Sequence, residues 1–72
     1  MTTQEIKKLL SENDNHYSIN NNDHELEIMF SEHLSRFCVR FNGQFMSTAK
    51  TIDSPLKKFN ELKAKYSLTI EA

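Results

Sequence analysis

The chain has 72 residues and a net charge of −1, and 38% of its residues are hydrophobic. A chain of this length forms one domain with no room for a deep substrate cleft, so we expect a single small domain over residues 1–72. Its single cysteine excludes an internal disulfide, which favours a reducing compartment.

The first residues carry no pattern typical of a targeting signal. The segment Met-Thr-Thr-Gln-Glu lacks a basic run followed by an apolar one, which argues against a secretory signal. No apolar stretch approaches the roughly 20 residues that a transmembrane helix needs. We therefore expect a complete cytoplasmic protein that does not act at a membrane.

The net charge conceals a difference between the two parts of the chain. Residues 1–34 hold seven acidic residues against two basic ones, a sum of −5, whereas residues 35–72 hold seven basic against three acidic, a sum of +4. Such asymmetry is typical of a binding surface with both signs of charge. The alternative interpretation is that neighbouring strands of opposite charge neutralise each other.

A short helix is expected first, over residues 3–12. Thr2 and Glu5 fit a capping box, in which each side chain accepts a hydrogen bond from the backbone N–H of the other residue. Apolar residues at i, i+3 and i+4 form one stripe: Ile6, Leu9 and Leu10. The segment 13–15, Asn-Asp-Asn, ends the helix because these side chains compete for backbone hydrogen bonds.

Alternating apolar and polar residues predict four strands between residues 17 and 49. Strand side chains point alternately to opposite faces, so a period of two indicates a sheet with one buried face. Three turns connect these strands: residues 21–24, the region of His33-Leu34, and Asn42-Gly43. Asn-Gly is the preferred pair for a tight hairpin because both residues need positive φ.

The three turns also predict which residues lie opposite one another. Each register keeps the apolar residues on a single face of the sheet, as a half-buried antiparallel sheet requires. The predicted opposite pairs are Ile19 with Leu26, Tyr17 with Ile28, Phe30 with Phe37, Val39 with Met46, and Phe37 with Thr48.

A second helix is expected to begin at Ser54-Pro55, because serine is a good N-cap and the fixed φ of proline suits the first helical position. Its buried stripe consists of Leu56, Phe59, Leu62 and Tyr66. Residues 66–70 alternate again and are compatible with a short further strand. The sequence thus predicts an α+β fold in the order α-β-β-β-β-α: a four-stranded antiparallel meander with both helices packed on one face.

The same registers predict the face that the helices leave open. Three cross-strand neighbours are expected there, with Arg40 also beside Phe45: Glu27 with Arg40, Met29 with Cys38, and Ser31 with Arg36. Met29, Cys38 and Phe45 then form an apolar strip with a charged rim, which is typical of a protein-binding surface, including that of a homodimer. We predict a protein-binding site made of Met29, Arg36, Arg40, Phe45 and Glu27, in which Glu27 holds Arg40 in place. Alternatively, the strip is too small to matter or is covered by the tail.

No pattern predicts catalysis or a metal site. The three histidines and Cys38 lack the paired spacing that a zinc site needs. Cys38 lies in mid-strand, where packing is the more common role than reactivity. The carboxylates are scattered, and a single glycine excludes a phosphate-cradling loop. We expect a protein that is not an enzyme and binds no cofactor and no metal.

The order of elements resembles that of the double-stranded-RNA-binding domain and of the HicA-type toxin ribonucleases. Lys57-Lys58 partly matches the Lys-Lys-x-Ala-Lys cluster of the RNA-binding domain, and His24 is the nearest counterpart of the toxin histidine, without its Gly-Ser-His segment. The resemblance implies nucleic-acid binding through Lys50, Lys57, Lys58, Lys63 and Lys65. Because the acidic first half opposes a polyanion, nucleic acid is the second choice. The other explanation for these lysines is a solvated helix face.

A protein of this size without chemistry of its own resembles in kind the small inhibitors encoded by phages and mobile elements, such as anti-CRISPR proteins. These occupy a functional surface of a larger partner, and charge of both signs suits docking onto a nucleic-acid-handling complex. We therefore expect a small non-enzymatic protein-binding module, inhibitor or regulator. Its expected partner is another protein or a second copy of the chain.

Overall fold

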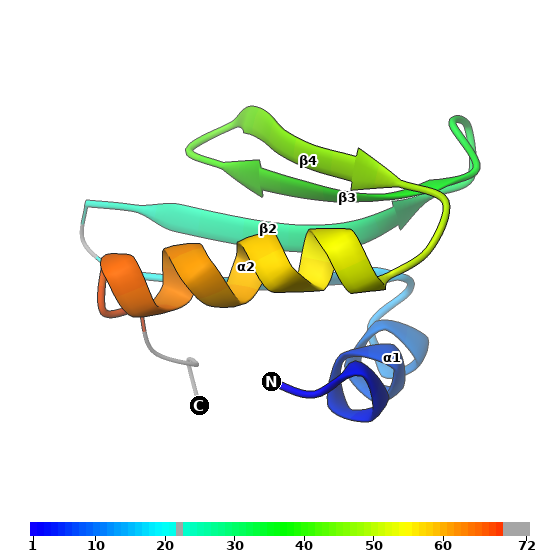
Figure 1. Cartoon of the computed structure of the whole chain (residues 1–72), viewed down its shortest axis with the longest axis horizontal. Helices are drawn as coiled ribbons and strands as arrows, with labels where there is room; N and C mark the ends of the chain where they lie inside the picture. Colours follow the sequence, from blue (N-terminus) through cyan, green and yellow to red (C-terminus); the bar gives the residue numbers. More distant parts are fainter. Residues whose placement is uncertain (22, 69–72) are drawn as a thin grey trace.

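The chain folds into two helices and one antiparallel sheet, in the element order α1 (Thr3–Glu12), β1 (His16–Asn20), β2 (Glu25–Ser31), β3 (Arg36–Phe41), β4 (Gln44–Ala49) and α2 (Asp53–Lys65). The computed structural model describes residues 1–21 and 23–68. The strands are arranged in the order β1-β2-β3-β4, and Figure 1 shows β2, β3 and β4 in this succession. The predicted α+β meander with its α-β-β-β-β-α order is confirmed.

Helix α1 begins and ends as its sequence predicts. The Thr2 hydroxyl accepts a hydrogen bond from the Glu5 backbone N–H at 3.2 Å, and a Glu5 carboxylate oxygen accepts one from the Thr2 N–H at 3.0 Å. Asn13 is the C-cap, and the next two residues, Asp14 and Asn15, have φ values of 55° and 62°. Asp and Asn tolerate this left-handed region better than most residues, so they turn the chain into β1.

Hydrogen bonds join the Asn42-Gly43 turn, which connects β3 and β4, to a third strand, β2. Both of its residues have positive φ, 52° and 83°, as the tight hairpin requires. The Asn42 N–H donates to the Glu25 carbonyl, and the Asn42 side-chain oxygen accepts from the Glu25 N–H, both at 2.8 Å. The turn between β3 and β4 is therefore held against the start of β2.

The predicted registers of the first three strands are confirmed: Ile19 faces Leu26, Tyr17 faces Ile28, and Phe30 faces Phe37. The predicted register between β3 and β4 is wrong beyond the Arg40–Phe45 pair. Val39 faces Ser47 and Phe37 faces Ala49, because an irregularity leaves Met46 as one extra residue on β4. A β-bulge of this kind shifts all following pairs by one.

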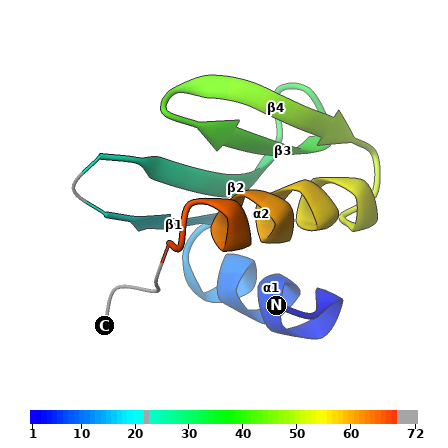
Figure 2. The same cartoon turned by 60° about the vertical axis from the view of Figure 1, so that its left-hand side comes forward.

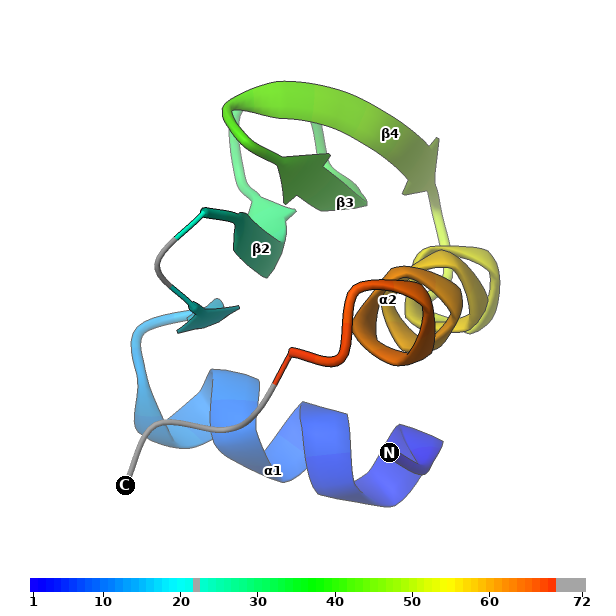
Figure 3. The same cartoon turned by 90° about the vertical axis from the view of Figure 1, so that its left-hand side faces the viewer.

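Both helices cover the same face of the sheet, as expected (Figure 2). Figure 3 shows the sheet curving around α2, with α1 closing the space between β1 and α2. One hydrophobic cluster unites the helices, the sheet and the segment after α2: Ile6, Leu10, Ile19, Leu26, Ile28, Val39, Ile52, Leu56, Phe59, Leu62 and Leu68. The N-terminus joins this arrangement, since the Met1 ammonium donates to the Asn60 side-chain oxygen at 3.0 Å.

Helix α2 begins earlier than Ser54-Pro55, so the predicted N-cap is wrong. The N-cap is Ile52, which has helical φ and ψ and no side-chain cap. Ile52 is 3% exposed, and its burial in the core decides where the helix begins. Pro55 then occupies the third helical position, where it removes no helical hydrogen bond because the first four N–H groups lack a helical partner.

The end of α2 is a turn and not the start of a strand. The Leu68 N–H donates to the Lys63 carbonyl at 3.0 Å and the Ser67 N–H to the Ala64 carbonyl at 3.4 Å, with Ser67 at φ 52°. This is a Schellman motif, and it directs Leu68 into the core. Of the strand predicted over residues 66–70, the positions up to 68 belong to this turn, and the last two lie outside the described residues.

Candidate functional site

The side of the sheet that faces away from both helices is called here the open sheet face. The three predicted cross-strand neighbours on it are confirmed: Glu27 with Arg40, Met29 with Cys38, and Ser31 with Arg36. Phe45 on β4 pairs with Arg40, as predicted. The open sheet face comprises His16, Ser18, Asn20, Glu25, Glu27, Met29, Ser31, Arg36, Cys38, Arg40, Phe45 and Thr48, none of which belongs to the hydrophobic core cluster. All five predicted binding residues therefore lie on one face.

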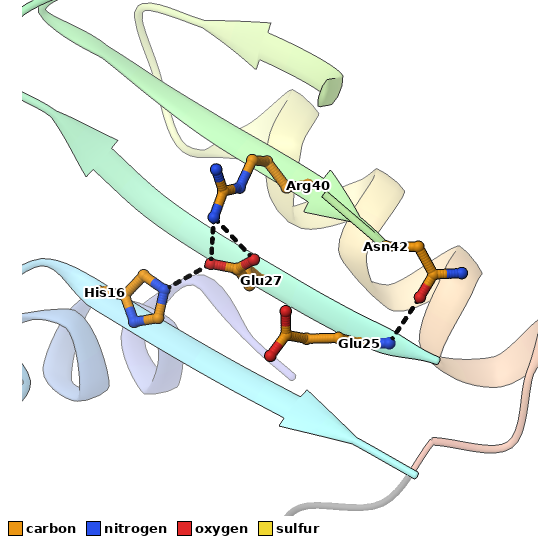
Figure 4. Close-up of polar contacts among 5 residues, drawn as sticks. All are labelled: His16, Glu25, Glu27, Arg40 and Asn42. Carbon is orange, nitrogen blue, oxygen red and sulfur yellow. Dashed lines mark hydrogen bonds and ion pairs between the residues drawn. The ribbon is translucent and has the colours of Figure 1, made fainter. Parts of the chain in front are cut away.

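Glu27 lies at the centre of a polar cluster that spans three strands. Its side chain is 7% exposed, and one terminal nitrogen of Arg40 on β3 donates to both carboxylate oxygens at 2.9 Å. His16 Nε2 on β1 lies 2.8 Å from Oε2 of the same carboxylate (Figure 4). Because a carboxylate only accepts hydrogen bonds, this imidazole nitrogen carries a proton. The predicted contact between Glu27 and Arg40 is thus present, with His16 as a further partner.

Two opposing influences act on the pKa of Glu27. Burial is the largest single influence, and it raises the pKa because it removes water from the charged form. The hydrogen bonds from His16 and Arg40, together with the positive charge of Arg40, outweigh burial and hold the pKa of Glu27 below its usual value. Glu27 is therefore a buried anion at neutral pH, and it fixes the position of the Arg40 guanidinium.

Arg40 in turn supports an exposed aromatic ring. Its guanidinium carbon lies 5.8 Å from the centre of the Phe45 ring, within the range of a cation–π contact. Phe45 is 59% exposed, the highest value among the large exposed hydrophobic residues described. The Arg40 Nε is buried without a hydrogen-bond partner among the described residues. The open sheet face therefore presents a ring on an arginine that is already held in place.

The predicted apolar strip of Met29, Cys38 and Phe45 is wrong as a continuous exposed surface. Cys38 is fully buried and Met29 half-buried, so of the three only Phe45 is exposed. Cys38 lies between Met29 and Thr48 on the adjacent strands, and its short side chain does not reach past them. Burial raises the pKa of the Cys38 thiol despite the opposing charge of Arg36, which favours the protonated, packed form.

His16 is a residue of this cluster that the sequence-based prediction did not include. A usable signal existed, because the β1–β2 register pairs His16 with Met29 and so places it on the same face as Glu27. A histidine diagonal to a carboxylate on one face of a sheet is within reach of a side-chain contact.

The five lysines predicted as a nucleic-acid site are spread along α2 and the segment before it. Lys57 and Lys58 lie in the first half of α2, whereas Lys63 and Lys65 lie in its last turn and Lys50 precedes the helix. Two of them are engaged locally: Lys58 lies 3.9 Å from Glu61, and Lys65 lies over the Tyr66 ring at 5.5 Å.

Among residues 1–21 and 23–68, no three His, Cys, Asp or Glu side chains are grouped so that they could hold a metal ion. Within the same residues, no helix has the length and apolar character needed to cross a membrane. Comparison with known proteins finds no matching family model, no similar curated protein and no similar solved structure. The function is therefore inferred from the geometry of the open sheet face.

Proposed function

We propose that this chain is a small protein-binding module that regulates or inhibits a protein partner through its open sheet face. The observation that carries the proposal is the exposed Phe45 ring seated on Arg40, whose guanidinium is fixed by the buried Glu27. Aromatic and arginine side chains dominate the binding energy of protein interfaces. Residues that are ordered before binding lose less entropy when the complex forms.

The surroundings of Phe45 support a protein partner. Arg36 and Glu25 are exposed on neighbouring strands, so the face carries both signs of charge at its rim. Such a rim steers association and suppresses wrong partners more than it adds affinity. The partner we favour is a nucleic-acid-handling complex in the cytoplasm, with the chain acting as a small inhibitor from a phage or mobile element.

The test uses the full chain as bait in a lysate of its source cells, followed by affinity measurement with the purified captured protein. Phe45→Ala and Arg40→Ala are expected to weaken binding by at least about tenfold, the effect of removing an interface anchor. Lys8→Ala, at an exposed position of α1, is the matched control and should bind as the wild type does. Unchanged affinity of both open-face variants would contradict the proposal.

The alternative, a nucleic-acid-binding protein, is separated by a second pair of variants. Lys57 is exposed and Lys58 half-buried on α2, away from the open sheet face. Fluorescence anisotropy with duplex RNA and DNA at low salt is expected to show no binding by the wild type, because the acidic first half repels phosphate. Binding that Lys57→Ala/Lys58→Ala abolishes and Phe45→Ala preserves would replace the protein-binding proposal.

A further inference from the structure

A groove of about 380 Å³ opens between α1 and the end of the sheet. Its lining residues are Lys7, Leu10, Ser11, Asn15, Phe30 and Phe37. The two phenylalanine rings meet edge to face with their centres 4.9 Å apart. Both lie on the core side of the sheet, yet each is only half-buried. The groove is thus an apolar end of the core that remains accessible between α1 and the sheet.

An exposed leucine lies at the same end of the molecule. Leu34 occupies the turn between β2 and β3 and is 50% exposed; Figure 1 shows this turn at the same end of the molecule as α1, with the ends of β2 and β3 between the turn and the helix. Leu34 does not line the groove. The turn is ordered, since the Leu34 N–H donates to the Ser31 hydroxyl at 3.3 Å and the Ser35 N–H to the Glu32 carbonyl at 3.3 Å. One end of the molecule therefore carries both an exposed apolar side chain and an apolar groove.

We propose that two copies of this chain form a homodimer in which Leu34 of each copy inserts into the groove of the other. A two-fold axis brings the same surface of both copies together, so an exposed apolar residue and an apolar recess at one end of the molecule can satisfy each other reciprocally. An aliphatic side chain that enters a recess walled by Leu10, Phe30 and Phe37 removes apolar surface from water on both copies. The contact uses neither Phe45 nor the open sheet face, so it does not depend on the proposed function.

Charge complementarity favours a second copy over other occupants of the groove. Lys7 lies at the groove, and Glu32 lies on the turn that carries Leu34. Neither side chain forms an ion pair with another residue in the described part of the chain. Insertion of Leu34 brings the Glu32 of one copy towards the Lys7 of the other, twice per dimer. Opposite charges at the rim of a contact fix its register.

The test measures molar mass by size-exclusion chromatography with light scattering over a range of protein concentrations. The wild type is expected to approach twice the chain mass of 8.4 kDa. Leu34→Ser is expected to weaken dimerisation by at least about tenfold, because it removes the central anchor. Since Leu34 is half exposed, this variant should keep the circular dichroism spectrum and melting temperature of the wild type.

The pair of Lys7 and Glu32 supplies a second test, which distinguishes a contact between two copies from a role of these residues within one copy. Lys7→Glu and Glu32→Lys are each expected to weaken the dimer, and the double variant Lys7→Glu/Glu32→Lys is expected to restore it. Lys8→Glu makes the same charge change at the next position of α1 and should leave the dimer intact. Phe45→Ala should do the same while losing the protein partner, which separates this proposal from the proposed function.

Two outcomes would overturn the proposal. One is a wild type that remains monomeric at the highest concentration reached. The other is a dimer that Leu34→Ser leaves unchanged, because that dimer would form through another surface.

Discussion

The side chain that decides most about the open sheet face is that of Glu27, which is 7% exposed although it lies on the side of the sheet opposite to the core. Removing a carboxylate from water costs free energy, which its bonds to Arg40 and His16 compensate. Such a cluster contributes less to stability than to the position of its members. In this cluster the residue that is held in place is Arg40, which lies between the buried carboxylate and the exposed Phe45 ring.

Glu27→Gln is expected to lower the free energy of unfolding by about 1–3 kcal/mol at neutral pH, because Arg40 loses its charged partner. Glu27 has a lower pKa in the folded chain than in the unfolded chain, where its pKa is near 4.5. Its stabilisation is therefore complete above that pH and is lost as the pH falls through the lower, folded pKa. Urea unfolding at about pH 7 and about pH 3 should show the difference between variant and wild type shrinking in acid.

Glu5 is the control for that experiment. Hydrogen bonds from Thr2 also lower its pKa, so it adds to the acid sensitivity in the same direction. Glu5→Gln should leave the affinity for the protein partner unchanged, whereas Glu27→Gln should lower that affinity. A difference between Glu27→Gln and wild type that stays constant from neutral to acidic pH would show that the carboxylate charge has no such role.

At the scale of elements, the sequence predicts helix ends, turns and strands best where they depend on residues that are close together in the chain. The capping box of α1, the Asn42-Gly43 turn and the alternation in β1 to β3 depend on neighbouring residues, and the structure confirms each. The start of α2 and the bulge do not follow from local rules. Ile52 begins the helix because it packs in the core. The bulge leaves no mark in the sequence, because Phe45 and Met46 are both apolar and either could continue the alternation.

On the open sheet face, the sequence predicts the positions of residues better than their exposure. The registers place Glu27, Arg40 and Phe45 together correctly, because cross-strand position follows from turn length. Exposure on that face was predicted less well. Whether Cys38 is covered depends on the length and direction of the side chains around it, which alternation does not specify.

The Asn42-Gly43 turn provides a prediction for a single element. Gly43 has a φ of 83°, and a Cβ added there would meet no atom within 4 Å. Gly43→Ala should therefore lower the free energy of unfolding by about 1–2 kcal/mol through backbone strain alone. Gly43→Asn should cost less, because asparagine tolerates positive φ. Chemical denaturation checks both, and equal stability of Gly43→Ala and wild type would contradict this explanation.

At the scale of the whole molecule, a single cluster holds together elements from both ends of the chain. Ile6 of α1, Phe59 of α2 and Leu68 after α2 all pack against the same face of the sheet. A chain of this length has a total stability of about 4–11 kcal/mol. One large side chain at the centre of such a cluster is therefore a substantial fraction of that total.

Phe59→Ala is expected to cost about 3–5 kcal/mol and to leave a large unfolded population. Phe59 is fully buried, with its ring centre 6.4 Å from that of Tyr17. Phe45→Ala makes the same chemical change at a position 59% exposed and should leave stability nearly unchanged. Thermal and urea unfolding followed by circular dichroism compare the two, and similar losses in both variants would contradict a single central core.

The bulge at Met46 affects how the chain resists self-association into fibres. β4 is an outer strand of the sheet among the described residues, and its segment Gln44–Ala49 contains no charged residue and no proline. A straight, uncharged edge of this composition is a template for cross-β growth, in which identical strands stack without limit. The extra residue breaks the regular spacing of backbone donors and acceptors along that edge. The bulge thus protects an edge strand that lacks the lysine or proline residues which usually prevent pairing with another chain.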